Sequence, residues 1–203
     1  TTITSISSIM SNARDYLFQI PFKQYSISNW SEHKKKIVEA LPLDQYTDFY
    51  DNLYKMPSYL PVVSDAISES MQNFADTYPC PVMITSMWYA NSQKGDGHKP
   101  HNHGSTGYSA ILYVDFDMAE HESTIFYSPF QEPATGDSMK FKPNIHEGDL
   151  IIFPSMILHE APANLSSSKS RLIVSFNIMG DDCAKAYTSG LNASPLTRKD
   201  FDK

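Results

Sequence analysis

The fold class is indicated by short strand-like segments such as Arg171-Leu-Ile-Val-Ser-Phe-Asn-Ile-Met179. Its β-branched and aromatic residues favour a strand, in which Arg171, Ile173, Ser175 and Asn177 share one face. Four segments of similar texture precede it, separated by Gly, Pro, Asn, Ser and Asp. They span residues 82–90, 107–116, 123–127 and 149–153. Short strands without intervening helical periodicity predict an antiparallel sandwich or barrel of the jelly-roll type.

The residues before this β-rich region have a helical pattern. Ser28 or Ser31 is expected to cap a helix that runs to about Leu41. A second helix is predicted from Pro61 to about Asp76, because apolar residues recur there at helical spacing. Helices followed by strands predict an α+β unit, mainly β, in which the helices brace one sheet.

The change from a helical to a strand-like residue pattern, and then to a polar tail, divides the chain into three parts. Residues 1–80 are expected to form an N-terminal helical support region, and residues 81–180 the β-sheet core. Residues 181–203 are expected to be a polar C-terminal tail. A length of 203 residues suits one compact domain that contains all three parts.

Composition excludes several classes of protein. With 41% hydrophobic residues the chain can bury a core. Its 16 basic and 23 acidic residues give a net charge of −7, which argues against nucleic acid or a membrane surface as partner. The two cysteines, Cys80 and Cys183, have no metal-ligand spacing and suit a reducing compartment. No apolar run reaches the roughly 20 residues that span a bilayer, so we expect a soluble, cytoplasmic protein.

Three of the seven histidines cluster just before a predicted strand. On an extended segment, His101 and His103 point to the same side and can present two imidazoles to one ion. His98 lies outside this pair, beyond Pro100. Histidine-rich loops also occur for solubility alone, so the cluster by itself leaves metal binding open.

Two further features lie downstream. His159 follows a strand that ends at Pro154, and taken alone it is typical of a core histidine. In a jelly roll, however, strands distant in sequence become neighbours, which would let His159 join His101 and His103 around a metal. Arg171, if its strand face points inward, would be a buried guanidinium suited to hold a carboxylate. An exposed arginine at a strand start is the alternative.

Together these features resemble the iron(II)- and 2-oxoglutarate-dependent oxygenases. More narrowly, the chain is similar to an oxygenase family with H-x-H-P, S-G-x-Y-Y, G-x-L-x-x-F-P-S-x-x-x-H and R-x-S-x-x-F-N segments. The matching segments here are His101-Asn-His103-Gly104, Ser109-Ala-Ile-Leu-Tyr113, Gly148 through Ser155 to His159, and Arg171 through Asn177. The departures are Gly104 in place of Pro, Ala110 and Leu112 in the tyrosine strand, and Ile173 in place of Ser.

The resemblance implies a double-stranded β-helix, a cupin-like jelly roll, with iron at one end. It assigns His101, His103 and His159 as metal ligands and catalytic residues, with His103 where most of the wider superfamily has Asp or Glu. It assigns Arg171 as the clamp for the remote carboxylate of 2-oxoglutarate. Tyr113, Ser109 and Ser175 are the further cofactor-binding residues that it implies. The implied cofactors are Fe(II), 2-oxoglutarate as cosubstrate, and O2.

The implied activity is a dioxygenase that hydroxylates a substrate while 2-oxoglutarate is decarboxylated to succinate. One alternative is a three-His cupin-like metal enzyme that does not use 2-oxoglutarate, and another is a noncatalytic jelly-roll binding module. The substrate, a small molecule or a peptide, is not indicated by the sequence, and the oligomeric state stays open, a homodimer included. Candidate substrate-contacting residues are Trp88, Asn91, His98, Tyr108 and Asn177.

Overall fold

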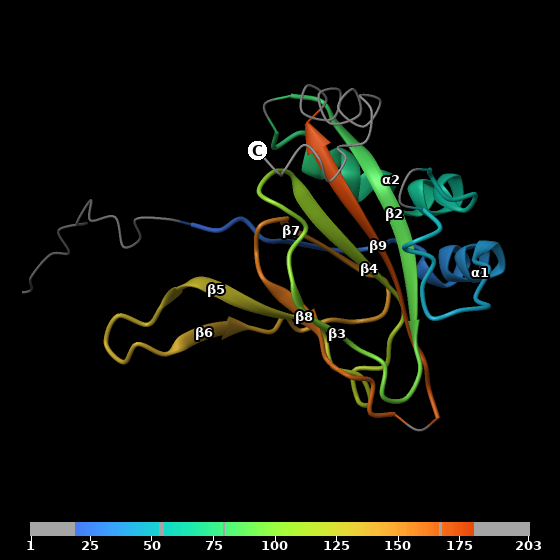
Figure 1. Ribbon diagram of the computed structural model, residues 1–203. Coiled ribbons are helices and arrows are strands. Elements are labelled where there is room, and N and C mark those ends of the chain that lie inside the picture. The colour runs from blue at the N-terminus through green and yellow to red at the C-terminus, as the bar shows by residue number, and fades with distance from the viewer. Residues whose placement is uncertain (1–18, 53–54, 79, 167, 181–203) are drawn as a thin grey trace, which may run out of the picture.

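A computed structural model describes residues 19–52, 55–78, 80–166 and 168–180 (Figure 1). The predicted polar tail over residues 181–203 lies outside the described residues. In the described part, the elements in chain order are β1 (Lys23–Ser26), α1 (Trp30–Ala40), α2 (Leu60–Ala75), β2 (Val82–Ser92), β3 (His98–His101), β4 (Tyr108–Asp115), β5 (Ile125–Gln131), β6 (Ser138–Phe141), β7 (Asp149–Pro154), β8 (His159–Ala161) and β9 (Arg171–Gly180).

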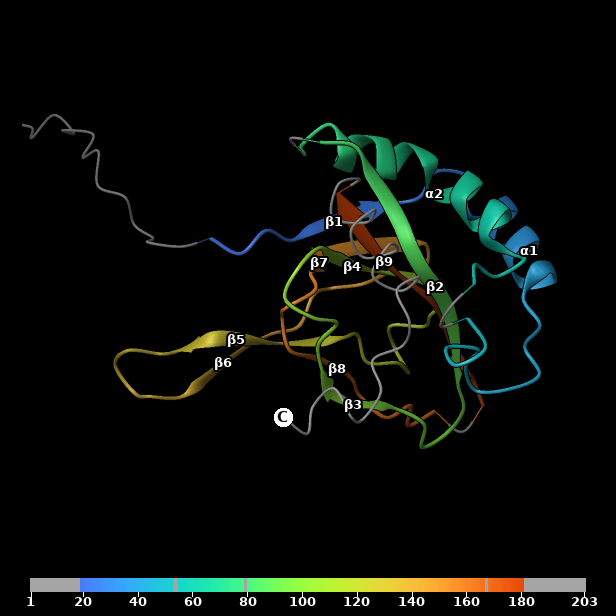
Figure 2. The same ribbon diagram turned by 45° about the horizontal axis from the view of Figure 1, so that its top comes forward.

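The strands form two antiparallel sheets. The larger has the order β1-β7-β4-β9-β2 and the smaller the order β3-β8-β5-β6. Helices α1 and α2 lie together on one side of the larger sheet, and the hairpin of β5 and β6 extends away from the body (Figures 1 and 2). The predicted jelly-roll type and the bracing of one sheet by N-terminal helices are therefore confirmed, although the two sheets in the described residues do not close into a barrel.

Alternation along the strands of the larger sheet builds two apolar layers. In β9, Val174 and Phe176 point toward the helices, where they pack with Ile37 of α1 and Ile67 of α2. Neighbouring positions point the other way, toward the smaller sheet. That second layer contains Ile111, Tyr113, Phe126, Ile151 and Phe153. Because side chains alternate with a period of two, one sheet serves both layers, and its inner face is free to carry a site.

The sequence predicted the long elements better than the short ones. All five predicted strands and both helices are present within a few residues of their expected bounds. Strands β1, β3, β6 and β8 were not predicted, because three or four residues are too short to show a period. The predicted serine cap of α1 is wrong. The N-cap is Asn29, whose φ of 51° is left-handed and which makes no side-chain capping bond.

Neither helix in the described ranges is long and apolar enough to cross a bilayer.

Candidate active site

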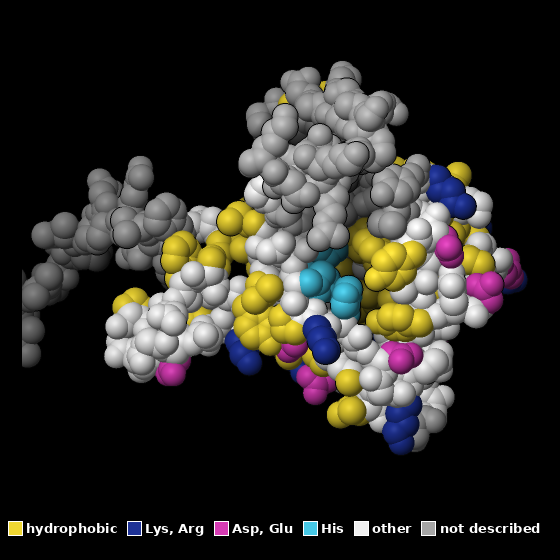
Figure 3. All heavy atoms as spheres, viewed as in Figure 1, with side chains coloured by type: hydrophobic (Ala, Val, Ile, Leu, Met, Phe, Trp, Pro, Cys, Tyr) yellow, Lys and Arg dark blue, Asp and Glu magenta, His cyan; other side chains and the backbone are white. Residues whose placement is uncertain are grey.

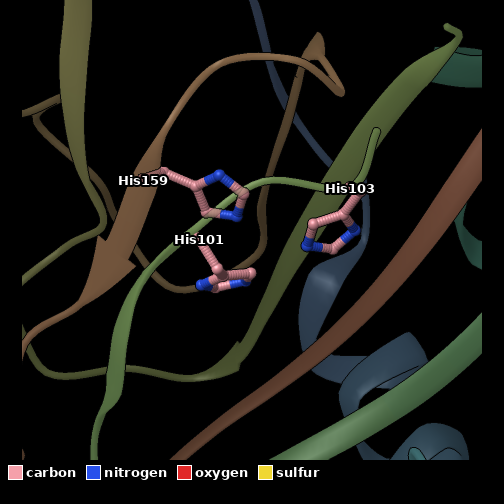
Figure 4. Close-up of side chains that lie close together, drawn as sticks. All are labelled: His101, His103 and His159. Carbon is pink, nitrogen blue, oxygen red and sulfur yellow. The ribbon is translucent and has the colours of Figure 1, made fainter. Parts of the chain in front are cut away.

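Strand pairing brings two of the predicted metal ligands together. Strands β3 and β8 pair in antiparallel register with His101 directly opposite His159. His103 follows β3, and its backbone N–H donates to the carbonyl oxygen of Ser155 at 2.9 Å. The three rings converge on one space (Figure 4), and a ligating nitrogen of each lies within 4.8 Å of the others. Among the described residues this trio is the group of His, Cys, Asp and Glu side chains with metal-binding geometry.

Each of the three imidazoles has one nitrogen held by an acceptor. Nδ1 of His101 lies 2.8 Å from the carbonyl oxygen of Lys99, and Nδ1 of His159 lies 2.9 Å from that of Ile157. Nδ1 of His103 lies 2.8 Å from Oδ1 of Asn177. Since these oxygens only accept, each Nδ1 carries the proton and each Nε2 keeps a free lone pair. Such outer contacts are typical of metal-binding histidines.

The charge state of the histidines suits a cation. Burial is the main cause that lowers the pKa of His103 below its ordinary value, and burial lowers the pKa of His159 to about 3. Both rings are therefore neutral near pH 7 and can donate lone pairs. Nitrogens bound at about 2.1 Å to one ion lie at most about 4.2 Å apart. The observed spacing of up to 4.8 Å is larger, so a bound divalent ion would draw the three rings closer together. The donor set of three imidazoles fits such an ion.

Asn177 is the residue that orients His103. Its Oδ1 accepts from Nδ1 of His103 and also from the hydroxyl of Ser109 at 2.9 Å. Its Nδ2 donates to the hydroxyl of Ser86 at 2.9 Å. The Ser109 hydroxyl also lies 3.0 Å from that of Ser155. Asn177, which the sequence suggested as a substrate contact, thus has its amide engaged on both sides, and Ser109 belongs to the same network.

Removing the Asn177 acceptor should weaken metal binding. Leucine is similar in size but cannot accept the His103 proton, so we expect Asn177→Leu to lower metal affinity roughly 10- to 100-fold. Asn177→Asp keeps an acceptor oxygen and should retain most of the affinity. Competition of the protein with a coloured chelator for zinc measures both variants, with Asn91→Leu as the control on the same sheet. Equal affinity in Asn177→Leu and the parent protein would exclude the orienting role.

Arg171 is buried, as expected if its strand face points inward. Only 2% of its surface is exposed. Its guanidinium donates to the carbonyl oxygens of Glu122 at 2.9 Å and Pro162 at 2.7 Å. None of the ion pairs found in the described residues includes Arg171. Burial is the main cause that lowers the pKa of Arg171 below its ordinary value. A buried cation without a carboxylate partner favours an anionic ligand.

A narrow inner cavity runs between the two sheets from the histidines toward the Arg171 end of β9. Ser175 and Ile173 line it, as does Ser92, the cross-strand partner of Arg171. Tyr113 faces the same layer from β4, fully buried, with its hydroxyl 2.8 Å from that of Thr124. Thr124 itself lines the cavity. The predicted cofactor-binding residues Ser175 and Tyr113 thus lie on the face that Arg171 shares.

A wider outer cavity of about 490 Å³ adjoins the inner one, and His101 and His103 line both. Of the candidate substrate-contacting residues, Trp88, His98 and Asn177 line the outer cavity. Asn91 and Tyr108 line neither cavity. Asn91 is three residues from Trp88 on β2 and so points to the opposite face, and Tyr108 packs edge-on against Phe74 of α2 and against Tyr78.

Sequence reasoning missed the segment at residues 46–50. Tyr46, Phe49 and Tyr50 form one wall of the outer cavity. The available signal was the density of tyrosines before α2, which periodicity could not assign to a helix or a strand. Ser86 and Thr124, the partners of Asn177 and Tyr113, were also missed, because hydrogen bonds between distant strands leave no local pattern.

Comparison with known proteins finds a family match and similar solved structures. Residues 86–177 match the family model described as "Putative 2OG-Fe(II) oxygenase". No curated protein matches the chain. Among solved structures, the chain resembles iron-bound HygX from Streptomyces hygroscopicus, with a TM-score of 0.58 and 13% identity, over 80% of this chain and 83% of HygX. It also resembles a viral collagen prolyl hydroxylase, vCPH of Paramecium Bursaria Chlorella virus-1, in its 2OG complex.

The prolyl hydroxylase match has a TM-score of 0.51 and 16% identity, and covers 78% of this chain and 95% of vCPH. A further match is less extensive. An oxidoreductase of the 2OG-Fe(II) oxygenase family from Burkholderia pseudomallei is 11% identical with a TM-score of 0.46, over 61% of this chain. The chain spans only 58% of that protein. The likenesses to HygX and vCPH confirm the double-stranded β-helix fold. The family match is a separate finding: residues 86–177 are similar to the 2OG-Fe(II) oxygenases, a class of enzymes.

Proposed function

We propose that this protein is an iron(II)- and 2-oxoglutarate-dependent dioxygenase that hydroxylates its substrate. One C–H bond of the substrate would become C–OH, one atom of O2 entering the product and the other entering succinate, with release of CO2 from 2-oxoglutarate. The observation that carries the proposal is Arg171, a buried guanidinium without a carboxylate partner among the described residues. It lies on the same strand face as Asn177, which orients His103.

The charge balance supports 2-oxoglutarate as cosubstrate. Three neutral imidazoles would leave iron(II) with its full charge of about +2, which a 2-oxoglutarate dianion neutralises. His101, His103 and His159 would hold the metal through Nε2, and Arg171 would hold the remote carboxylate with its free N–H groups. Because the inner cavity is narrow, we expect its lining side chains to move apart when the dianion enters.

The chain's own residues would supply position and a dry environment. Bound iron and 2-oxoglutarate supply the oxygen activation. The backbone carbonyls of Lys99 and Ile157 and the amide of Asn177 keep the three rings in one tautomer and one orientation. The apolar layer around Phe153 and Ile111 limits the access of water to the inner cavity. A reducing cytoplasm suits this chemistry, since iron must stay iron(II) and Cys80 is a free thiol.

Anaerobic titration of iron(II), with and without 2-oxoglutarate, tests the function. We expect one iron per chain and a weak visible charge-transfer band that develops only when both are present. Iron binding without any effect of 2-oxoglutarate would favour the three-His cupin-like enzyme instead. A protein that binds no stoichiometric metal would be a jelly-roll binding module, and the proposal would fail.

A further inference from the structure

The outer cavity has a preformed wall opposite the histidines. The segment that carries Tyr46 and Phe49 is fixed to β2 by three contacts. Thr47 forms a β-bridge with Ala90, and its hydroxyl donates to the carbonyl oxygen of Tyr89 at 2.6 Å. The backbone N–H of Asn91 donates to the carbonyl oxygen of Tyr46 at 2.7 Å. The cavity therefore lies between a pinned segment and the His98–His103 region, without a need for loop ordering.

Aromatic rings follow this cavity from its mouth to the candidate metal site. The ring of Tyr50, which is 78% exposed, meets Phe49 edge-on at 5.3 Å. Phe49 meets Trp88 edge-on at 5.1 Å, and Trp88 stacks on His103 at 5.4 Å. Figure 3 shows the histidines in a hollow with hydrophobic side chains beside it. A large exposed ring next to a cavity is typical of a surface that a ligand covers.

The eleven described residues that line the outer cavity include no Lys, Arg, Asp or Glu. A charged substrate would lose its hydration there without a compensating partner. The lining therefore favours an uncharged ligand.

Several polar side chains of the lining are already engaged within the protein. Asn177 has three partners, and the hydroxyl of Thr47 is used by Tyr89. Oδ1 of Asn102 accepts from the backbone N–H of Gly104 at 3.2 Å, and the hydroxyl of Tyr46 lies 3.4 Å from the carbonyl oxygen of Gly97. A sugar would bring many hydroxyls to a wall with few free partners, whereas a flat apolar ring would find stacking surfaces.

We propose that the outer cavity binds an uncharged substrate through a flat aromatic ring, which packs against the aromatic wall of Tyr50, Phe49 and Trp88. Its role as the substrate site rests on the proposed function, but its ligand preference can be measured separately. The ring would enter past Tyr50 and stop beside His103 and His101. The C–H bond to be oxidised would then lie on or next to the ring.

Four probes of different chemistry test the ligand class by calorimetry on the full-length protein loaded with zinc and 2-oxoglutarate, whose dianion offsets the charge of the metal. They are naphthylmethanol, naphthalene sulfonate, naphthylmethylammonium and methyl glucoside. We expect naphthylmethanol to bind at least about tenfold more tightly than the other three. Equal or tighter binding of an ionic probe or of the glucoside would overturn the proposal.

Location is tested by nuclear magnetic resonance and by mutation. The chain has two tryptophans, so in Trp30→Phe the remaining indole N–H signal belongs to Trp88 and should shift on addition of naphthylmethanol. Tyr50→Ala and Phe49→Ala should each lower the affinity for naphthylmethanol roughly three- to tenfold. Tyr50 is exposed, so its replacement does not threaten folding. Phe141→Ala removes an exposed ring outside this cavity and should have no effect. An unmoved Trp88 signal, or unchanged affinity in Tyr50→Ala, would overturn the assignment.

Titration of 2-oxoglutarate into iron-loaded protein from the same preparation, without O2, separates this inference from the proposed function. Binding of 2-oxoglutarate without a preference for naphthylmethanol would contradict the ring site alone. A ring preference at Trp88 without binding of 2-oxoglutarate would support the ring site and contradict the dioxygenase.

Discussion

Replacing His159 by alanine should lower metal affinity by more than about 100-fold, and the same is expected for His101→Ala and His103→Ala. Each change removes a direct metal bond, and even the loss of an outer contact typically costs about 10- to 100-fold. The measurement is metal content after dialysis, together with chelator competition for zinc and iron(II). Circular dichroism of the metal-free variants separates loss of the ligand from loss of the fold.

His98→Ala is the matched control for these variants. The His98 ring stacks on His101 with 3.9 Å between centroids, but it does not belong to the trio of ligating nitrogens. We therefore expect His98→Ala to bind metal like the parent protein. If His103→Ala kept its full iron while His98→Ala lost it, the ligand set would have to be reassigned with His98 in place of His103.

Replacing Arg171 by alanine should weaken the binding of 2-oxoglutarate by roughly 30-fold or more, because a buried charged partner typically contributes about 2 to 5 kcal/mol to binding. The affinity of Arg171→Lys for 2-oxoglutarate should fall between those of the parent protein and Arg171→Ala. Lysine supplies the charge but not the planar fork that pairs with a carboxylate. Iron binding should stay nearly unchanged in both, because the arginine is not a ligand. Calorimetric titration of 2-oxoglutarate into iron-loaded protein without O2 measures these affinities.

Lys169→Ala controls for a general loss of positive charge near this end of β9. Lys169 is a solvent-exposed cation two residues before Arg171 and pairs with Asp117. Its removal should leave the affinity for 2-oxoglutarate within about twofold, because exposed charges contribute little through water. Equal affinities in the parent protein, Arg171→Ala and Lys169→Ala would exclude Arg171 as the carboxylate clamp.

Local sequence was sufficient for the long elements and for the histidine pair at the start of the site. The alternation in β9 correctly grouped Arg171, Ile173, Ser175 and Asn177 on one face, since strand geometry is independent of what the strand packs against. The same geometry separates Trp88 from Asn91, so the sequence already contained the reason why both could not line one cavity. The extended run through His101 and His103 placed two imidazoles near each other for the same reason.

Contacts between distant strands required the tertiary structure. Strand β8 has only three residues, and nothing near His159 indicates that it pairs with β3 opposite His101. The link from Asn177 to His103 also crosses two elements far apart in the chain. In sequence, Asn177 looked equally suited to contact a substrate. Only the register of the strands decided that its amide faces an imidazole and two hydroxyls.

The sequence by itself determined the mainly β fold class, the helical brace and the residues with metal-binding chemistry, because backbone periodicity and side-chain chemistry are local properties. The tertiary structure decided which histidines meet, that Arg171 is buried without a carboxylate within the described chain, and that Tyr46, Phe49 and Tyr50 line the outer cavity. These properties depend on burial and on register between segments distant in the chain, and neither is a function of neighbouring residues alone.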